Sequence, residues 1–167
     1  MSERNDLHVT VSDLRARMAH AGHLFRRFAG SLSRRPPSAD DEAWAESQLL
    51  AVEVPLWRRM PPQDRRHAVE VAHRFLATRP DATTAEVAGA LLHDVGKVEA
   101  GLGTAGRVLA TLVPEGRARG RFATYRAHEK IGARWCEQRG SDPVTVALVA
   151  GTGSGPAAAA LRAADDV

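Results

Sequence analysis

The chain has 167 residues, of which 44% are hydrophobic and 26% charged, and its formal net charge is +3 at pH 7. This composition is typical of globular proteins, and no apolar run approaches the roughly 20 residues that cross a bilayer. We therefore expect no membrane partner. The polar first residues and the single cysteine, Cys136, predict a cytoplasmic location.

Helical spacing marks the first two predicted elements. From Ser12 to Leu32, apolar side chains recur at steps of three and four residues, which predicts an amphipathic helix. Two prolines in SLSRRPPSADD interrupt this pattern. The segment DEAWAESQLLAVEVPLW then predicts a short second helix with an acidic start. We assign residues 1–56 to a helical extension that packs on a core domain of residues 57–167.

The segment MPPQDRRHAVEVAHRFLATRP predicts the next helix, because prolines stand at its entrance and after its exit. His67 precedes the apolar Val71 by one turn, so its side chain points toward the interior. His73 lies about 240° further round the helix and points away. A single buried histidine is more often a hydrogen-bonded core residue than a ligand, so His67 alone indicates little.

The segment DATTAEVAGALLHDVGK opens with a capping box, Thr83 followed by Glu86, and Gly96 predicts its end. His93 and Asp94 then fall in the last helical turn. A carboxylate is disfavoured at the negative end of a helix dipole, so Asp94 requires a compensating cation. A bound metal ion would supply one.

Three further segments predict helices: FATYRAHEKIGARWCEQRG, DPVTVALVAG and PAAAALRAADDV. The glycines in GLGTAGRV indicate a turn and not a phosphate-binding loop, because no strand precedes them. The β-branched run at Val144–Val149 follows an Asp142 cap and Pro143, which favours a helix. No region alternates apolar and polar residues over the length of a strand. We therefore predict an all-α fold, a single-domain helical bundle.

Divalent transition metals take imidazole nitrogen and carboxylate oxygen as ligands, and a catalytic site keeps fewer protein ligands than its full coordination number. His67 from one helix, the His93–Asp94 pair from the next and an aspartate near the C-terminus would meet that requirement. We predict one divalent ion, with Mn, Fe, Co, Ni, Zn and Mg all open.

The order His, His-Asp, Asp resembles the HD-domain superfamily of metal-dependent phosphohydrolases, over about residues 58–167. His67 in DRRHAVEVA matches the family's first histidine, and the pair in ALLHDVGK matches its signature. Asp165 in LRAADD matches the closing aspartate, because the family places that ligand directly after alanine. The metal ligands that the resemblance implies are His67, His93, Asp94 and Asp165.

The resemblance also implies a bundle of the HD-domain type and hydrolysis of a small phosphorylated substrate, such as a nucleotide, by a phosphomonoesterase or phosphodiesterase. Asp94, Lys97 and His128 are the expected catalytic residues, with His128 as acid or base for the leaving group. The expected phosphate contacts are Lys97, Arg107 and Arg121. In the alternative interpretation, Lys97 is a solvated helix-end charge and both arginines are surface residues.

Two other classes of function remain open. Some family members use a His-His pair before the last helix for a second metal, and Gly151–Gly153 stands there instead. This favours a catalytically silent HD-like module that binds a metal or a phosphorylated ligand for regulation. A nucleic-acid-binding role rests on the arginine clusters alone, and the small net charge leads us to expect no such partner.

Overall fold

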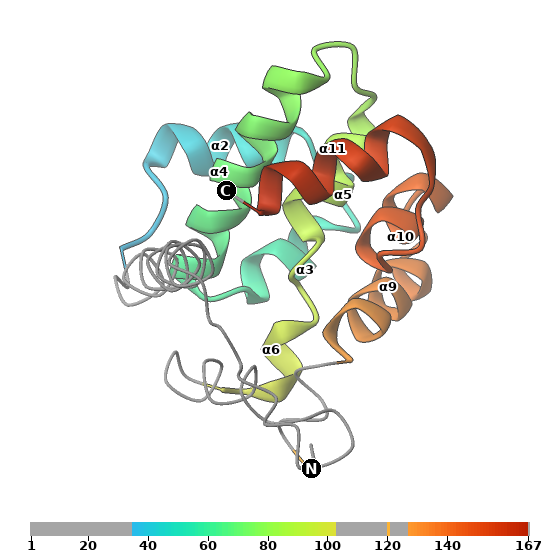
Figure 1. Cartoon of the computed structure of the whole chain (residues 1–167). Helices are drawn as coiled ribbons and strands as arrows, with labels where there is room; N and C mark the ends of the chain where they lie inside the picture. The colour runs from blue at the N-terminus through green and yellow to red at the C-terminus, as the bar shows by residue number, and fades with distance from the viewer. Residues whose placement is uncertain (1–34, 103–119, 121–126, 167) are drawn as a thin grey trace, which may run out of the picture.

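The computed structural model describes residues 35–102, 120 and 127–166, and all regular structure within these ranges is helical (Figure 1). The helices are α2 (Ala39–Ser47), α3 (Val54–Arg59), α4 (Pro62–Thr78), α5 (Thr84–Leu92), α6 (Lys97–Ala100), α9 (His128–Arg139), α10 (Pro143–Val149) and α11 (Gly155–Asp165). The all-α prediction is confirmed, while the HD-type arrangement stays a prediction. The predicted helix from Ser12 lies outside the described residues. Among the helices that are described, none combines the length and apolar character needed to cross a membrane.

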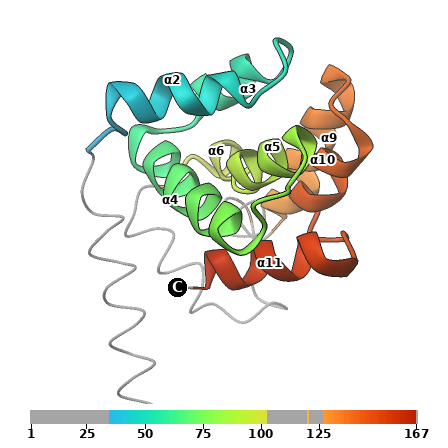
Figure 2. The same cartoon turned by 90° about the horizontal axis from the view of Figure 1, so that it is seen from above.

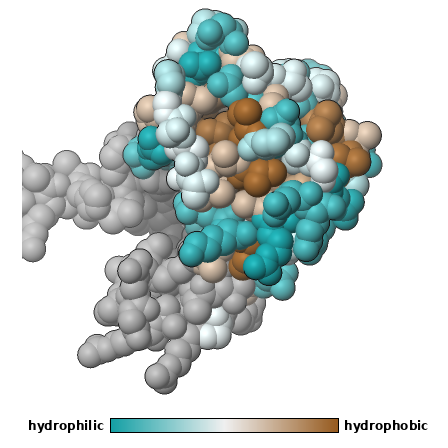
Figure 3. Space-filling view, turned by 90° about the vertical axis from the view of Figure 1, so that its right-hand side faces the viewer, coloured by the Kyte–Doolittle hydropathy of each residue, from teal (hydrophilic) through white to brown (hydrophobic). Residues whose placement is uncertain are grey.

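Helix α5 occupies the middle of the bundle. It packs against α4, α10 and α3, while α11 lies on α4 and α9 lies on α10 and α6 (Figure 2). One buried core connects these helices and includes Ala45 of α2, Phe75 of α4, Leu91 of α5 and Leu161 of α11. Each large apolar side chain buried in this way contributes roughly 1.5–3 kcal/mol. On the outside, hydrophobic residues gather between hydrophilic ones on the face that Figure 3 shows.

Several helix ends follow the signals in the sequence. The capping box of Thr83 and Glu86 is present at the start of α5. The side chain of Asp142 accepts a hydrogen bond from the backbone N–H of Val144 and so caps α10. In α4, His67 faces the bundle and His73 is 54% exposed, as predicted.

Two predicted helices differ from the structure. The segment predicted as one helix after residue 40 divides into α2 and α3, because a turn lies between them. Glu53 stabilises that turn by accepting a hydrogen bond from the N–H of Leu50, and Pro55 lies in the first turn of α3. Helix α5 ends at Leu92 instead of Gly96, and the turn at 93–96 leads directly into α6.

The predicted domain boundary at residues 56 and 57 falls inside α3. Ala45 on one side of it and Trp57 on the other belong to the same buried core. Because residues 1–34 lie outside the described ranges, the division into extension and core domain stays a prediction.

Helix α9 comes unusually close to the backbone after α5 at Gly96. A Cβ atom on Gly96 would lie 1.9 Å from the carbonyl oxygen of His128 and 2.7 Å from the backbone nitrogen of Gly132. No side chain fits in that space, so glycine is required here for packing and not to end a helix. This close approach places the first turn of α9 beside Asp94.

Candidate metal centre

Three of the four predicted metal ligands meet in the structure. His67 of α4, His93 at the end of α5 and Asp165 at the end of α11 each offer one ligand atom, and these atoms all lie within 4.8 Å of one another. Asp165 Oδ1 is 3.0 Å from His67 Nε2 and 3.5 Å from His93 Nε2. Three helices that are far apart in sequence therefore bring donors of the predicted kind to one place.

The spacing and the state of the donors fit a metal ion. Two ligand atoms at about 2.1 Å from a tetrahedral ion lie about 3.4 Å apart, close to the distances from Asp165 to both imidazoles. The Nδ1–H of His93 donates to the carbonyl oxygen of Ala90 at 2.8 Å, which leaves Nε2 as the ligand atom of the neutral ring. That Nε2 atom is buried and has no hydrogen-bond partner within the described part of the chain.

The end of α11 is fixed to α4 by a contact that sequence analysis missed. Arg74 Nε donates a hydrogen bond of 2.8 Å to the carbonyl oxygen of Ala164, one residue before the ligand. Arg74 follows His67 by two helical turns, so both side chains lie on the same side of α4. The contact also explains why Asp165, and not the exposed Asp166, faces the histidines.

Asp94, the fourth predicted ligand, lies beside this group and is not part of it. Its carboxylate is 6% exposed, forms an ion pair with Lys97 Nζ, and is 3.6 Å from His93 Nε2. The compensating cation expected for Asp94 is therefore Lys97 in this structure. Asp94 as a direct ligand stays a prediction.

The charges in this cluster are strongly coupled. Burial alone would raise the pKa of both Asp94 and Asp165, but neighbouring cationic groups and hydrogen bonds outweigh it and lower both pKa values. Burial alone would lower the pKa of His93, but the charges of Asp94 and Asp165 prevail and raise it. Both carboxylates are thus held ionised, and the cluster attracts a cation.

The other predicted catalytic residue, His128, also reaches this cluster, with Nε2 3.5 Å from Asp94 Oδ1. Lys97 and His128 thus lie on the side of Asp94 that faces α6 and α9. The predicted phosphate contacts Arg107 and Arg121 lie outside the described residues.

Comparisons with models of known protein families, with curated proteins and with solved structures find no match for this chain. The candidate metal centre therefore rests on its own geometry, and membership of the HD-domain superfamily stays a prediction.

Proposed function

We propose that the chain is a metal-dependent phosphohydrolase of the HD-domain type that acts on a small phosphorylated substrate, such as a nucleotide, in the cytoplasm. The observation that carries the proposal is the convergence of His67, His93 and Asp165 around Nε2 of His93, which is buried and makes no hydrogen bond within the described residues although carboxylate oxygens lie 3.5 and 3.6 Å away. An isolated histidine in a core would be expected to find a hydrogen-bond partner.

In this proposal, His67 and His93 hold the ion through neutral imidazole nitrogens, and Asp165 contributes a negative charge. When bound, a divalent ion supplies Lewis acidity, which activates water and polarises a phosphoryl group. The carbonyl oxygen of Ala90 keeps the ring of His93 oriented, because it accepts the proton on Nδ1. One of the three ligands is thus oriented before any ion arrives.

Asp94 organises the neighbouring proton donors and acceptors. One oxygen of Asp94 lies 3.5 Å from Nε2 of His128, which holds the imidazole beside the cluster. In this proposal His128 is the acid or base for the leaving oxygen. The ammonium of Lys97 forms an ion pair with Asp94, and as a compact positive charge it could contact a phosphate oxygen.

The proposal is tested by metal analysis and a hydrolysis screen. Purified protein is loaded with Mn, Co, Ni, Zn, Fe or Mg, its bound metal is measured by mass spectrometry, and hydrolysis of p-nitrophenyl phosphate, its bis-ester and nucleotides is followed. We expect uptake of one ion and hydrolysis of at least one substrate, and His93→Ala should remove both. His73→Ala is the control, because this histidine shares α4 with the proposed ligand His67 but is exposed and lies outside the cluster. Absence of metal uptake, or hydrolysis that persists in His93→Ala, would contradict the proposal.

One observation favours the alternative, a catalytically silent HD-like module that binds a metal or phosphorylated ligand for regulation. Asp94 is already paired with Lys97, which leaves three gathered ligands in place of four. Metal uptake that depends on His93, without hydrolysis of any substrate in the screen, would support this alternative.

A further inference from the structure

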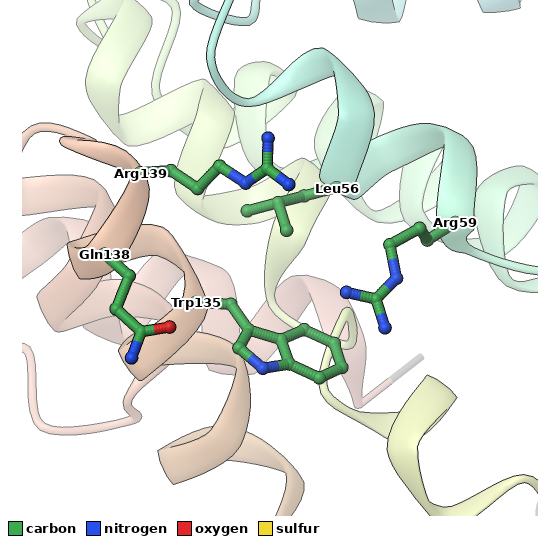
Figure 4. A pocket seen from close by; sticks show the side chains of 5 residues that line it. All are labelled: Leu56, Arg59, Trp135, Gln138 and Arg139. Carbon is green, nitrogen blue, oxygen red and sulfur yellow. The ribbon is translucent and has the colours of Figure 1, made fainter.

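A second charged region lies between α3 and the C-terminal half of α9. A pocket of about 210 Å³ opens there, and its lining residues are Leu56 and Arg59 of α3 and Trp135, Gln138 and Arg139 of α9 (Figure 4). Among the described residues that line this arginine pocket, none is acidic. The pocket therefore carries two positive charges from two different helices.

The guanidinium of Arg59 is held in position by an aromatic ring. Its central carbon lies 4.3 Å from the centroid of the Trp135 ring. A guanidinium that stacks on indole keeps its in-plane N–H groups available, so stacking orders the side chain without using its donors. Arg59 is thus ordered before any ligand binds.

Neither Arg59 nor Arg139 forms an ion pair or a hydrogen bond with a carboxylate in the described part of the chain. The neighbouring Arg58 is different, because its Nε and one terminal nitrogen each donate a 2.7 Å hydrogen bond to Glu46. Two uncompensated guanidinium groups on one pocket repel each other and attract an anion.

We infer that the arginine pocket binds a phosphate group between Arg59 and Arg139. A phosphate monoester carries close to two negative charges at neutral pH, which balances the two guanidinium groups, and its oxygens accept their paired N–H donors. The pocket is smaller than the roughly 300–1,000 Å³ of sites for drug-sized ligands. It therefore suits one phosphate group and not a whole larger molecule.

This site is separate from the metal centre and does not depend on the proposed function. Trp135 follows His128 by two turns of α9, which is about 10 Å along the helix axis. No residue of the arginine pocket belongs to the metal cluster of His67, His93 and Asp165.

The test is isothermal titration calorimetry of the metal-free full chain with inorganic phosphate and with pyrophosphate. We expect saturable binding of one phosphate group that weakens as salt is added. Arg59→Gln and Arg139→Gln should each weaken it at least about tenfold, because each removes charged hydrogen bonds. The control is Arg58→Gln, one residue away, whose guanidinium is already bound to Glu46. His93→Ala should leave phosphate binding unchanged.

Several results would overturn the inference. These are the lack of saturable binding, equal affinity in Arg59→Gln and the unaltered chain, and tighter binding of succinate than of phosphate. Phosphate binding that is lost in His93→Ala but kept in both arginine variants would place the anion at the metal centre instead. Both arginine side chains are exposed, so the variants are expected to fold, and circular dichroism checks this.

Discussion

Helix α9 contributes to two charged regions that are built in opposite ways. At its first residue, His128 joins a half-buried cluster that contains carboxylates, imidazoles and Lys97. Two turns later, its C-terminal half joins an exposed pocket with two guanidinium groups of the same sign. The first region offers ligand atoms for a cation, and the second offers N–H groups for an anion.

The two regions also differ in how their side chains are held. In the metal cluster, backbone groups fix the position of donors: Ala90 orients His93, and Arg74 holds the end of α11 through the carbonyl of Ala164. In the arginine pocket, one stacking contact with Trp135 orders Arg59. We therefore expect substitutions of residues that contact neither ion to alter binding at the metal cluster more than binding at the arginine pocket.

The largest expected effect comes from removing a ligand of the metal cluster. In Asp165→Ala, we expect metal affinity to fall at least about 100-fold, since even residues that only orient ligands change affinity by 10–100-fold. Mass spectrometry of the dialysed protein measures this. Asp166→Ala, the next residue, should retain its metal, because Asp166 faces solvent. Loss of the metal in Asp166→Ala but not in Asp165→Ala would mean that Asp166, and not Asp165, is the ligand.

Gly96→Ala tests the close contact between the backbone of α9 and the turn that follows α5. The new Cβ would overlap the carbonyl oxygen of His128, so we expect a loss of about 2 kcal/mol of unfolding free energy from overpacking, measured by urea denaturation. Gly140→Ala is the comparison: its Cβ would meet nothing within 4 Å, and its positive φ costs only about 1 kcal/mol. Equal losses in the two variants would mean that α9 can shift freely at Gly96.

Arg74→Gln tests whether a residue that contacts no metal tunes the cluster. Without the hydrogen bond to Ala164, the end of α11 is held less firmly, and we expect metal affinity to fall about tenfold. Arg162→Gln on the exposed face of α11 should leave the affinity unchanged. A titration with a metal-sensitive dye measures both, and no change in Arg74→Gln would rule out this role.

The smallest expected effect is a dependence of thermal stability on pH, which arises from the metal cluster and not from the arginine pocket. The pKa of His93 is raised above its usual 6.5, so its contribution to stability is complete below that pH and is lost as pH rises through the folded pKa. Asp94 and Asp165, whose pKa values are lowered, keep their contributions above about pH 4. The metal-free chain should therefore unfold at a higher temperature at about pH 5.5 than at about pH 8.

Differential scanning calorimetry of the metal-free chain measures this difference. It should shrink in His93→Asn and persist in Arg59→Gln, because guanidinium groups do not titrate in this range. A difference of the opposite sign would show that burial, and not the neighbouring carboxylates, dominates at His93.

Much of the metal cluster could be predicted from local patterns. The helical period of α4 places His67 on the buried side, and the capping box of α5 positions His93 at the far end of that helix. The assignment of Asp165 depended on a family resemblance, and the structure places this residue beside both histidines. Local spacing sufficed for the two histidines, because His67 lies within a regular helix and His93 lies at the end of one.

Other features could not be predicted because they depend on contacts between distant segments. The pairing of Asp94 with Lys97 requires the turn after α5. That turn exists because α5 ends at Leu92, before the end that the sequence predicts. The arginine pocket requires α3 to pack beside α9, and nothing near Arg59 in the sequence indicates that neighbour. The break between α2 and α3 depends on the Glu53 side chain folding back on the chain.

The contact between His67 and Asp165 joins residues that are 98 positions apart. An ion shared by these two side chains would act as a cross-link, in the manner of a disulfide. In the chain-entropy description, closing a loop of about 100 residues lowers the entropy of the unfolded chain by the equivalent of about 4.7 kcal/mol. Chelation is then expected to loosen the whole bundle as well as the three side chains that touch the metal.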